Sequence, residues 1–386
     1  MKKAILTVFL GMISFLAFPG CSEIKMLMKT EPPEAPECTN DECVWIFDSY
    51  QPSQWEQEWR RGEETGERRD RECEVLATPE ETLRSKRLIA AVTGLVLRGE
   101  PMPPESITLF SRMVYALRCG PDFKDTGRRR VQLIEPLIGI LRDPLTICPP
   151  GEGAKDALYE SFGLAEDAIQ SKRFLLIRPA APWTDTPDDS HSWRIGGFNP
   201  GPVEPKRCRA PMNFAFDLGA SFYDNWHGDK SAASTLWLVD RFQRHNVSFD
   251  WIVSFELEKF DPDQIYANIP KDILPHYLYF NQGVESDPEG KWNPWRILMS
   301  MGVNPRDYVA VKLDIDAPEI EQALIEQLQN NPKIRLLVDE VFFEHHVNVK
   351  AMWQYWGTDK SPVTIKDSMR IFSDLRSKGV RMHSWP

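Results

Sequence analysis

The sequence predicts an α/β fold: an open parallel sheet with helices on both faces, preceded by a small, mainly helical N-terminal region. Three observations support it. Apolar runs of strand length alternate with amphipathic segments after residue 211, helical spacing dominates the N-terminal half, and a stretch rich in Pro, Gly and Asp lies between them. Strands that alternate with helices form parallel sheets, and their crossovers cover both faces. The 386 residues are enough for two such parts.

The C-terminal elements follow one alternation. Residues 212–218 form an apolar run typical of a buried strand, residues 231–245 have helical spacing, and residues 249–255 form a second apolar run. Strand, helix and strand in this order make a βαβ unit with a right-handed crossover. The same patterns predict further strands at 308–313 and 334–338, a helix after Pro318, a helix at 365–377 and an edge strand at 380–385.

The N-terminal half predicts helices. Residues 79–98 and 105–118 place apolar side chains at helical spacing, and residues 131–141 form a third apolar segment of this helical region. Residues 55–74 mix Trp, Arg and Glu as in a solvated helix. We therefore divide the chain into a signal peptide (1–22), a tether and charged Trp-rich segment (23–74), a helical accessory region (75–178), a Pro- and Gly-rich linker (179–211) and the sheet domain (212–386).

The first 22 residues predict a secretory address. Two lysines precede a 15-residue apolar run, residues 4–18, which is short for a bilayer span and fits a signal peptide. Cleavage before Glu23 is one outcome, and an uncleaved anchor or lipidation at Cys21 are the others. We expect a protein of the secretory pathway or the exterior, with membrane contact only through this segment.

The cysteine content predicts disulfides, and the net charge argues against one class of partner. Seven cysteines all precede residue 209, and removal of Cys21 leaves six. In an oxidising compartment these predict up to three disulfides in any of 15 pairings, and buried free thiols are the alternative. No cysteine and histidine spacing predicts a zinc site. The net charge of −11 argues against a nucleic-acid partner, because that contact needs a basic face.

Acidic residues follow three predicted strands. Asp217 and Gly219 end the first, Glu256 ends the second, and Asp314 follows the third. Ligands of such sheets bind at the carboxyl ends of the strands. The glycine allows a ligand to approach the backbone, and a carboxylate after the second strand can accept both hydroxyls of a ribose. We expect Asp314 to point into the ligand cleft.

Asp316 and two histidines complete the candidate chemistry. Asp316 stands three residues before Glu319, with a proline between, and this spacing also fits a capping box at a helix start. His345 and His346 follow the strand that should neighbour Asp314. A histidine suits a general base near neutral pH, although paired histidines at a strand end are often structural.

Four segments resemble FkbM-type methyltransferases. Residues 217–220, 255–256 and 312–319 are similar to that family's D-x-G-A-N, F-E-P and K-I-D-V-E-G-x-E patterns, and residues 281–287 resemble the segment before its fourth strand. The resemblance covers roughly residues 209–345. Ser221 stands where the family has Asn, and Asp316 with Ala317 replaces Glu and Gly.

The resemblance implies a Rossmann-like methyltransferase sheet, S-adenosylmethionine as cofactor, and O-methyl transfer to a hydroxyl of a sugar or related small molecule or glycan. Asp314, Asp316, His345 and His346 are then the catalytic candidates. The implied cofactor-binding residues are Asp217 and Gly219 at the methionine end, Ala220 and Ser221 in the same loop, Glu256 at the ribose, and Ser286 and Asp287 near the adenine.

Two other functions fit some of the same residues. Asp314-Ile315-Asp316 after an apolar strand is also a D-x-D motif, which in glycosyltransferases holds a divalent metal and the diphosphate of a sugar nucleotide. A catalytically inactive, methyltransferase-like binding module is the second alternative. A manganese requirement would favour the first, and cofactor binding without turnover would favour the second.

Overall fold

The computed structural model describes nine stretches of the chain, and all of them belong to one compact unit. The predicted signal peptide, the predicted linker except residues 192–194 and 211, and five of the seven cysteines lie outside them. The described residues are 43–67, 78–98, 100–120, 122–138, 175–178, 192–194, 211–224, 234–349 and 353–385.

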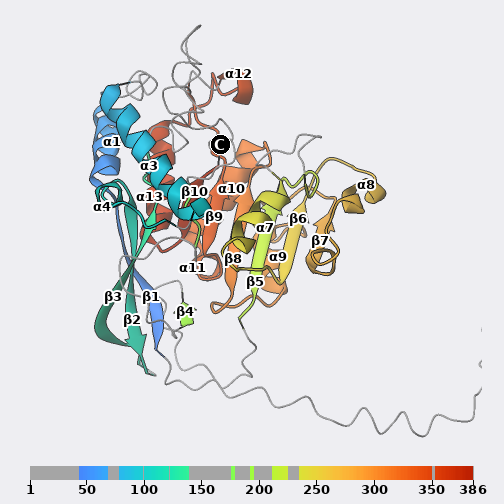
Figure 1. Cartoon of the computed structure of the whole chain (residues 1–386). Helices are drawn as coiled ribbons and strands as arrows, with labels where there is room; N and C mark the ends of the chain where they lie inside the picture. Colours follow the sequence, from blue (N-terminus) through green and yellow to red (C-terminus); the bar gives the residue numbers. More distant parts are fainter. Residues whose placement is uncertain are drawn as a thin grey trace, which may run out of the picture. The chain divides into compact units, whose positions relative to one another are not determined.

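A six-stranded sheet forms the C-terminal part (Figure 1). Its spatial order is β10-β9-β8-β5-β6-β7, and all neighbouring strands are parallel. Numbered from β5 along the chain, the order is 3-2-1-4-5-6, which is compatible with a Rossmann-like fold. The strands are β5 (Asn213–Leu218), β6 (Trp251–Phe255), β7 (Tyr277–Phe280), β8 (Tyr308–Leu313), β9 (Glu340–Phe343) and β10 (Arg381–Ser384).

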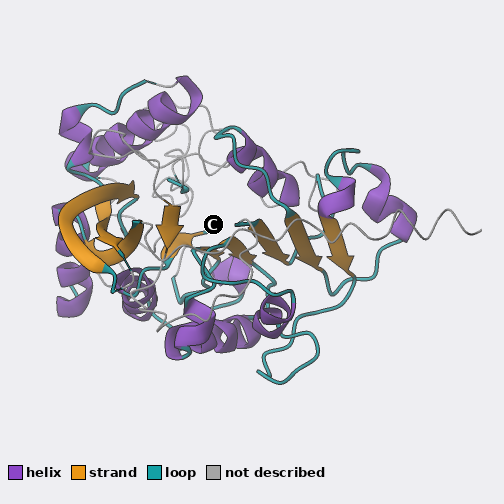
Figure 2. Ribbon diagram, turned by 90° about the horizontal axis from the view of Figure 1, so that it is seen from below, coloured by secondary structure: helices purple, strands orange, loops and turns teal. Residues whose placement is uncertain are grey.

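Helices flank both faces of this sheet, as the view in Figure 2 shows. Buried apolar side chains lie on both faces of the strands. One face carries Phe216, Val253 and Val311, and the other carries Ala215, Ile252 and Ala310, so each face must be covered. The helices of this part are α7 (Thr235–Gln243), α8 (Pro262–Ala267), the 3-10 turn η2 (Leu274–His276), α9 (Pro294–Ser300), α10 (Pro318–Asn330), α11 (Pro332–Arg335), α12 (Trp353–Trp356) and α13 (Ile365–Ser377).

A second sheet, of four strands, lies in the N-terminal part. Its order is β3-β2-β1-β4; β2 pairs antiparallel with β1 and β3, and β4 pairs parallel with β1. A disulfide joins Cys43 and Cys119 at one end of the β1–β2 pair. The elements are β1 (Val44–Gln51), α1 (Gln54–Thr65), α3 (Pro79–Arg98), α4 (Pro104–Ile107), β2 (Ser111–Cys119), β3 (Lys124–Ile134) and β4 (Ser192–Arg194).

The prediction of a mainly helical N-terminal region was wrong in two places. The segment expected as a helix at 105–118 is a single turn followed by β2, and most of the segment at 131–141 that the structure describes belongs to β3 or extends from it. Alternate residues of β2, with Ile134 of β3, pack against β1 in a separate apolar cluster. Apolar residues on the opposite face of these strands, such as Val114 and Leu133, are buried outside that cluster. Apolar side chains on both faces of a strand imitate helical spacing. The helices predicted within 55–74 and at 79–98 are present as α1 and α3.

Two C-terminal expectations also need correction. The predicted strand at 334–338 begins inside α11, which starts at Pro332 with Asn331 as its N-cap, and β9 comes after it. The capping box between Asp316 and Glu319 does not form, because Ala317 is the N-cap of α10 and makes no side-chain cap. The strands expected at 212–218, 249–255, 308–313 and 380–385 and the helices after Pro318 and at 365–377 are confirmed to within a few residues.

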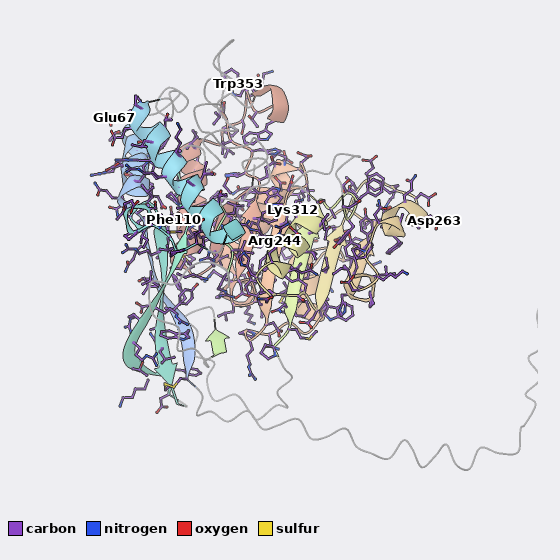
Figure 3. The ribbon with its side chains drawn as sticks, in the orientation of Figure 1. Glu67, Phe110, Arg244, Asp263, Lys312 and Trp353 are labelled. Atoms are coloured by element: carbon purple, nitrogen blue, oxygen red, sulfur yellow. A yellow bond between two sulfur atoms is a disulfide. The ribbon has the colours of Figure 1, made fainter. Side chains whose placement is uncertain are left out.

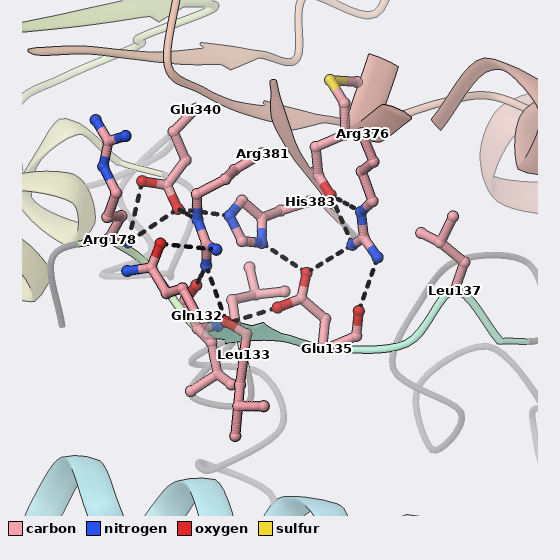
Figure 4. Close-up of polar contacts among 12 residues, drawn as sticks. Gln132, Leu133, Glu135, Leu137, Arg178, Glu340, Arg376, Arg381 and His383 are labelled. Carbon is pink, nitrogen blue, oxygen red and sulfur yellow. Dashed lines mark hydrogen bonds and ion pairs between the residues drawn. The ribbon is translucent and has the colours of Figure 1, made fainter. Parts of the chain in front are cut away.

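A buried charge network joins β10 to the N-terminal part (Figure 4). The imidazole of His383 lies 2.6 Å from a carboxylate oxygen of Glu135 and 2.6 Å from one of Glu340. Arg376 pairs with Glu135 at 3.2 Å, and Arg381 pairs with Glu340 at 3.2 Å. All five side chains are buried.

No helix among the described residues is long and apolar enough to cross a membrane.

Candidate functional site

Three acidic side chains and a glycine follow four neighbouring strands at the carboxyl edge of the parallel sheet. Leu218 pairs in register with Phe255 and Leu313, and Leu313 pairs with Phe343, so the four strands end level with one another. The chain leaves these ends with Gly219, Glu256, Asp314 and Glu344. With strands about 4.8 Å apart, Glu256 and Glu344 stand three strand spacings, or about 14 Å, from each other. Between β5 and β8 the winding of the sheet reverses, which is where ligands of such folds bind.

Lys312 occupies the centre of this edge (Figure 3). Its side chain is completely buried, and its ammonium donates to the carbonyl of Gly219 at 2.9 Å. The same nitrogen lies 3.2 Å from Oδ1 of Asp217 and 3.4 Å from Oδ2 of Asp314. Thr235 donates its hydroxyl to the other oxygen of Asp217 at 2.6 Å. The lysine therefore ties the ends of β5 and β8 together from within.

The charges of this group support one another. Burial alone would lower the pKa of Lys312, but attraction to Asp217 and Asp314 outweighs it and raises the pKa above its usual value. Burial raises the pKa of Asp217, and the Lys312 ammonium and the Thr235 hydroxyl oppose that rise. A buried ion pair is costly to form and far more costly to break by removing one partner. We assign Lys312 and Asp217 to the framework of the site.

Asp314 lies beside the end of the chain. Its Oδ2 accepts a hydrogen bond from the indole of Trp385 at 2.9 Å, and Trp385 is fully buried. Trp385 in turn packs edge-on against Trp237 of α7 and Phe342 of β9. The carboxylate of Asp314 retains 18% of its side-chain exposure. These contacts hold one of its oxygens in place.

The backbone N–H groups of the loop after β5 donate hydrogen bonds to other groups of the protein. The N–H groups of Gly219 and Ala220 both donate to the carbonyl of Phe255 at 3.0 Å, and the N–H of Ser221 donates to Oε2 of Glu256 at 2.8 Å. Gly219 has a φ of +86°, and a Cβ there would lie 1.7 Å from the carbonyl oxygen of Asp314. A glycine is therefore required for β5 and β8 to approach each other here.

The carboxylate of Glu256 accepts hydrogen bonds from the backbone of two loops and can accept further ones. Each of its oxygens accepts one backbone N–H, from Ser221 and from Glu258, both at 2.8 Å. A carboxylate offers about four acceptor positions, so about two remain. The side chain is half-buried. Glu256 thus lies where a carboxylate could receive the hydroxyls of a nucleoside.

Ser286 and Asp287 lie in the turn that precedes α9. The carbonyl of Ser286 accepts a hydrogen bond from Gln327 of α10 at 2.6 Å, and the Asp287 carboxylate accepts the N–H of Glu289 at 3.0 Å. The segment before them does reach the β6 end, because the Asn281 amide donates to the carbonyl of Glu256 at 3.0 Å. Among the described residues, no hydrogen bond joins the Ser286 or Asp287 side chain to Glu256.

The structure brings Asp316 and His346 together and turns His345 elsewhere. His346 Nε2 lies 3.8 Å from Oδ1 of Asp316 and 3.1 Å from Oε2 of Glu344. His345 is buried, bonds to the hydroxyl of Ser368 at 2.7 Å and stacks on Phe343. Of the two histidines, His346 is therefore the one placed at the sheet edge beside acidic groups.

The two aspartates of the D-x-D motif diverge. Asp314 faces the Lys312 ammonium, while Asp316, at a positive φ of 53°, faces His346 and Glu344. A divalent cation between the two aspartates would meet the positive charge of Lys312. This geometry does not match joint chelation of one metal by Asp314 and Asp316.

Sequence reasoning missed several members of this edge. Lys312 lies in one of the segments that resemble the methyltransferase family, but its position inside an apolar strand is itself a signal, because a lysine there must be paired. Thr235, Glu344 and Trp385 gave no comparable pattern, since their roles depend on contacts between distant parts of the chain.

A separate cleft of about 430 Å³ lies between α1 and α13, and none of the predicted site residues lines it.

Comparison of the chain with protein-family models, with curated proteins and with solved structures gives no match. The resemblance to FkbM-type methyltransferases therefore stays a prediction from the four segments that suggested it.

Proposed function

We propose that the protein is an S-adenosylmethionine-dependent O-methyltransferase whose cofactor lies over the β5–β6 half of the sheet edge. The observation that supports this most is the position of Glu256. Its carboxylate stands at the end of the strand next to β5 with acceptor positions to spare, and ribose hydroxyls are ligands of such a carboxylate in nucleoside-binding folds.

The loop after β5 favours a ligand without a diphosphate. Dinucleotides place their phosphates against free N–H groups of this loop and the following helix. Here the N–H groups of Gly219, Ala220 and Ser221 donate to Phe255 and Glu256 instead. S-adenosylmethionine has a nucleoside and a positive sulfonium but no phosphate, so it agrees with both the occupied amides and the acidic surroundings.

The β8–β9 half of the edge would receive the acceptor. S-adenosylmethionine supplies a methyl group on a cationic sulfur, and methyl transfer to oxygen needs the hydroxyl aligned and its proton removed. We propose His346 as the base that takes this proton, because Asp316 and Glu344 lie beside its Nε2 and would stabilise the charged imidazolium. We propose a hydroxyl of a sugar or related small molecule or glycan as the acceptor.

Ligand selectivity tests this proposal. The full-length protein is titrated in parallel with S-adenosylmethionine, NAD and a uridine diphosphate sugar, and formation of S-adenosylhomocysteine is followed with a panel of hydroxylated acceptors. Selective binding of S-adenosylmethionine with turnover supports the proposal. Binding without turnover on any acceptor favours the inactive module. Manganese-dependent binding of the sugar nucleotide instead would overturn it in favour of the glycosyltransferase.

A further inference from the structure

One oxygen of Asp316, one oxygen of Glu344 and one nitrogen of His346 form a compact donor set. These three atoms all lie within 4.8 Å of one another. Asp316 comes from the turn after β8, and the other two come from the segment after β9. The cluster thus draws on two adjacent strand ends of a rigid sheet.

The spacing of the donors suits a metal ion. With metal–ligand bonds of about 2.0–2.2 Å, two ligands of one ion in tetrahedral or octahedral geometry lie about 2.9–3.5 Å apart. The two distances from His346 Nε2 are 3.1 Å to Glu344 and 3.8 Å to Asp316. The third distance, between the two carboxylate oxygens, is at most 4.8 Å, so a shift of the exposed Asp316 side chain toward the other two donors would bring all three to one ion.

The surroundings fix the imidazole and leave one side open. The His346 side chain is 5% exposed, and its ring stacks on Trp356 with centroids 5.0 Å apart. The Asp316 side chain is 74% exposed. A bound ion would therefore have a fixed buried ligand and a solvent-facing side, which is the arrangement that keeps a coordination position for water or substrate.

A buried side chain supports the turn that carries Asp316. Glu321, almost completely buried, accepts the N–H of Ile315 at 2.9 Å beneath this turn.

We propose that Asp316, Glu344 and His346 bind one divalent transition-metal ion, of the Mn²⁺ to Zn²⁺ class, with at least one open coordination position. One imidazole and two carboxylates favour this class over Mg²⁺ and Ca²⁺, which prefer all-oxygen sites. Binding of the metal does not require the proposed methyl transfer, but it occupies Nε2 of His346, so the metal and the base role of that atom are alternatives. Its use does rest on that function: with the ion bound, an acceptor hydroxyl at the open position would lose its proton more easily, and solvent would take that proton.

Metal titration of the chelator-treated, full-length protein tests the proposal. Zn²⁺, Mn²⁺ and Mg²⁺ are titrated separately by calorimetry, and the Co²⁺-loaded protein is examined by visible absorption for mixed nitrogen and oxygen coordination. We expect one high-affinity site for Zn²⁺ or Mn²⁺ and much weaker binding of Mg²⁺. Asp316→Asn should weaken this site at least tenfold, and His346→Gln should remove it and its cobalt spectrum.

Asp316→Asn is a reliable variant because asparagine tolerates the positive φ at this exposed position. Glu319→Gln, an exposed carboxylate three residues away, is the matched control and should bind metal as the wild type does. Absence of binding at millimolar metal, or equal binding by wild type, Asp316→Asn and His346→Gln, would overturn the proposal. Separate titration of the metal-free protein with S-adenosylmethionine keeps failure of this site distinct from failure of the proposed function.

Discussion

The ammonium nitrogen of Lys312 lies 3.2 Å from Oδ1 of Asp217, and both side chains are fully buried at the ends of adjacent strands. This pair joins β5 to β8 where the winding of the sheet reverses. It separates a β5–β6 half of the edge, with Glu256, from a β8–β9 half, with Asp316 and His346. The proposed cofactor and acceptor positions therefore lie on either side of this buried ion pair.

Replacement of Lys312 by Met should destabilise the protein strongly. The variant leaves the buried Asp217 and the partly buried Asp314 without their cation, and removal of one partner from a buried pair costs about 3–5 kcal/mol. Lys333→Met, at an exposed position on α11, should change the free energy of unfolding by less than about 0.5 kcal/mol. Urea unfolding measures both, and equal stabilities would contradict the assignment of Lys312 to the framework.

Gly219→Ala should cost much more than Gly302→Ala. Both glycines have positive φ, +86° and +74°, so both variants carry the conformational cost of about 1–2 kcal/mol. A Cβ meets the Asp314 carbonyl at 1.7 Å in the first case and nothing within 4 Å in the second. The difference between their free energies of unfolding isolates the close approach of β5 and β8. Matching losses would show that this approach is not real.

The contribution of His383 to stability should depend on pH. Burial would lower its pKa, but Glu135 and Glu340 outweigh burial and raise the pKa above 6.5. A raised pKa stabilises the fold fully below the unfolded value, and the benefit disappears as pH rises through the folded pKa. Wild type should therefore exceed His383→Gln in stability most strongly near pH 6 and progressively less at alkaline pH.

The two glutamates act in the opposite direction. Burial would raise the pKa values of Glu135 and Glu340, but His383 and the arginines lower them below 4.5. Their stabilisation is present above that pH and decreases as pH falls through the folded values. In a Glu135→Gln background, the pH-dependent effect of His383→Gln should shrink. An unchanged pH profile in that background would argue against coupling between the two side chains.

Loss of the Cys43–Cys119 disulfide should lower stability by about 2–4 kcal/mol, because the bond closes a long loop in the unfolded chain. The two cysteines are 76 residues apart in sequence. The double variant Cys43→Ser/Cys119→Ser avoids a free thiol and is compared with wild type by urea unfolding. Peptide mapping of the unreduced protein provides the check: Cys43 joined to a different cysteine is the result that contradicts the structure.

The parallel sheet was predictable because most of its strands are apolar runs, and an apolar run itself indicates a buried strand. The runs that became β5, β6 and β8 are short, apolar and separated by helical segments, so local pattern and tertiary position agree. In contrast, β9 begins with Glu340, whose charge is compensated by Arg381 and His383 from the end of the chain. A charged strand start of this kind gives no local signal, whereas the apolar residues at 334–338, just before it, do match a strand pattern.

The candidate site was predictable only in part, for a similar reason. Parallel strands made it foreseeable that Asp217, Glu256 and Asp314 would share one edge. The partners of these side chains were not foreseeable: Trp385 reaches Asp314 from 71 residues away, and Thr235 reaches Asp217 across a βα connection. The N-terminal sheet escaped prediction because both faces of β2 are apolar.

Binding of S-adenosylmethionine to the full-length protein, measured by calorimetry for wild type, Glu256→Gln and the exposed control Glu289→Gln, tests the central claim most directly. We predict one site in wild type and in the control. Loss of charged hydrogen bonds to a ribose, worth about 1.5–3 kcal/mol, should weaken binding by Glu256→Gln about 10- to 150-fold. No heat at millimolar ligand, or equal affinities for wild type and Glu256→Gln, would contradict the account.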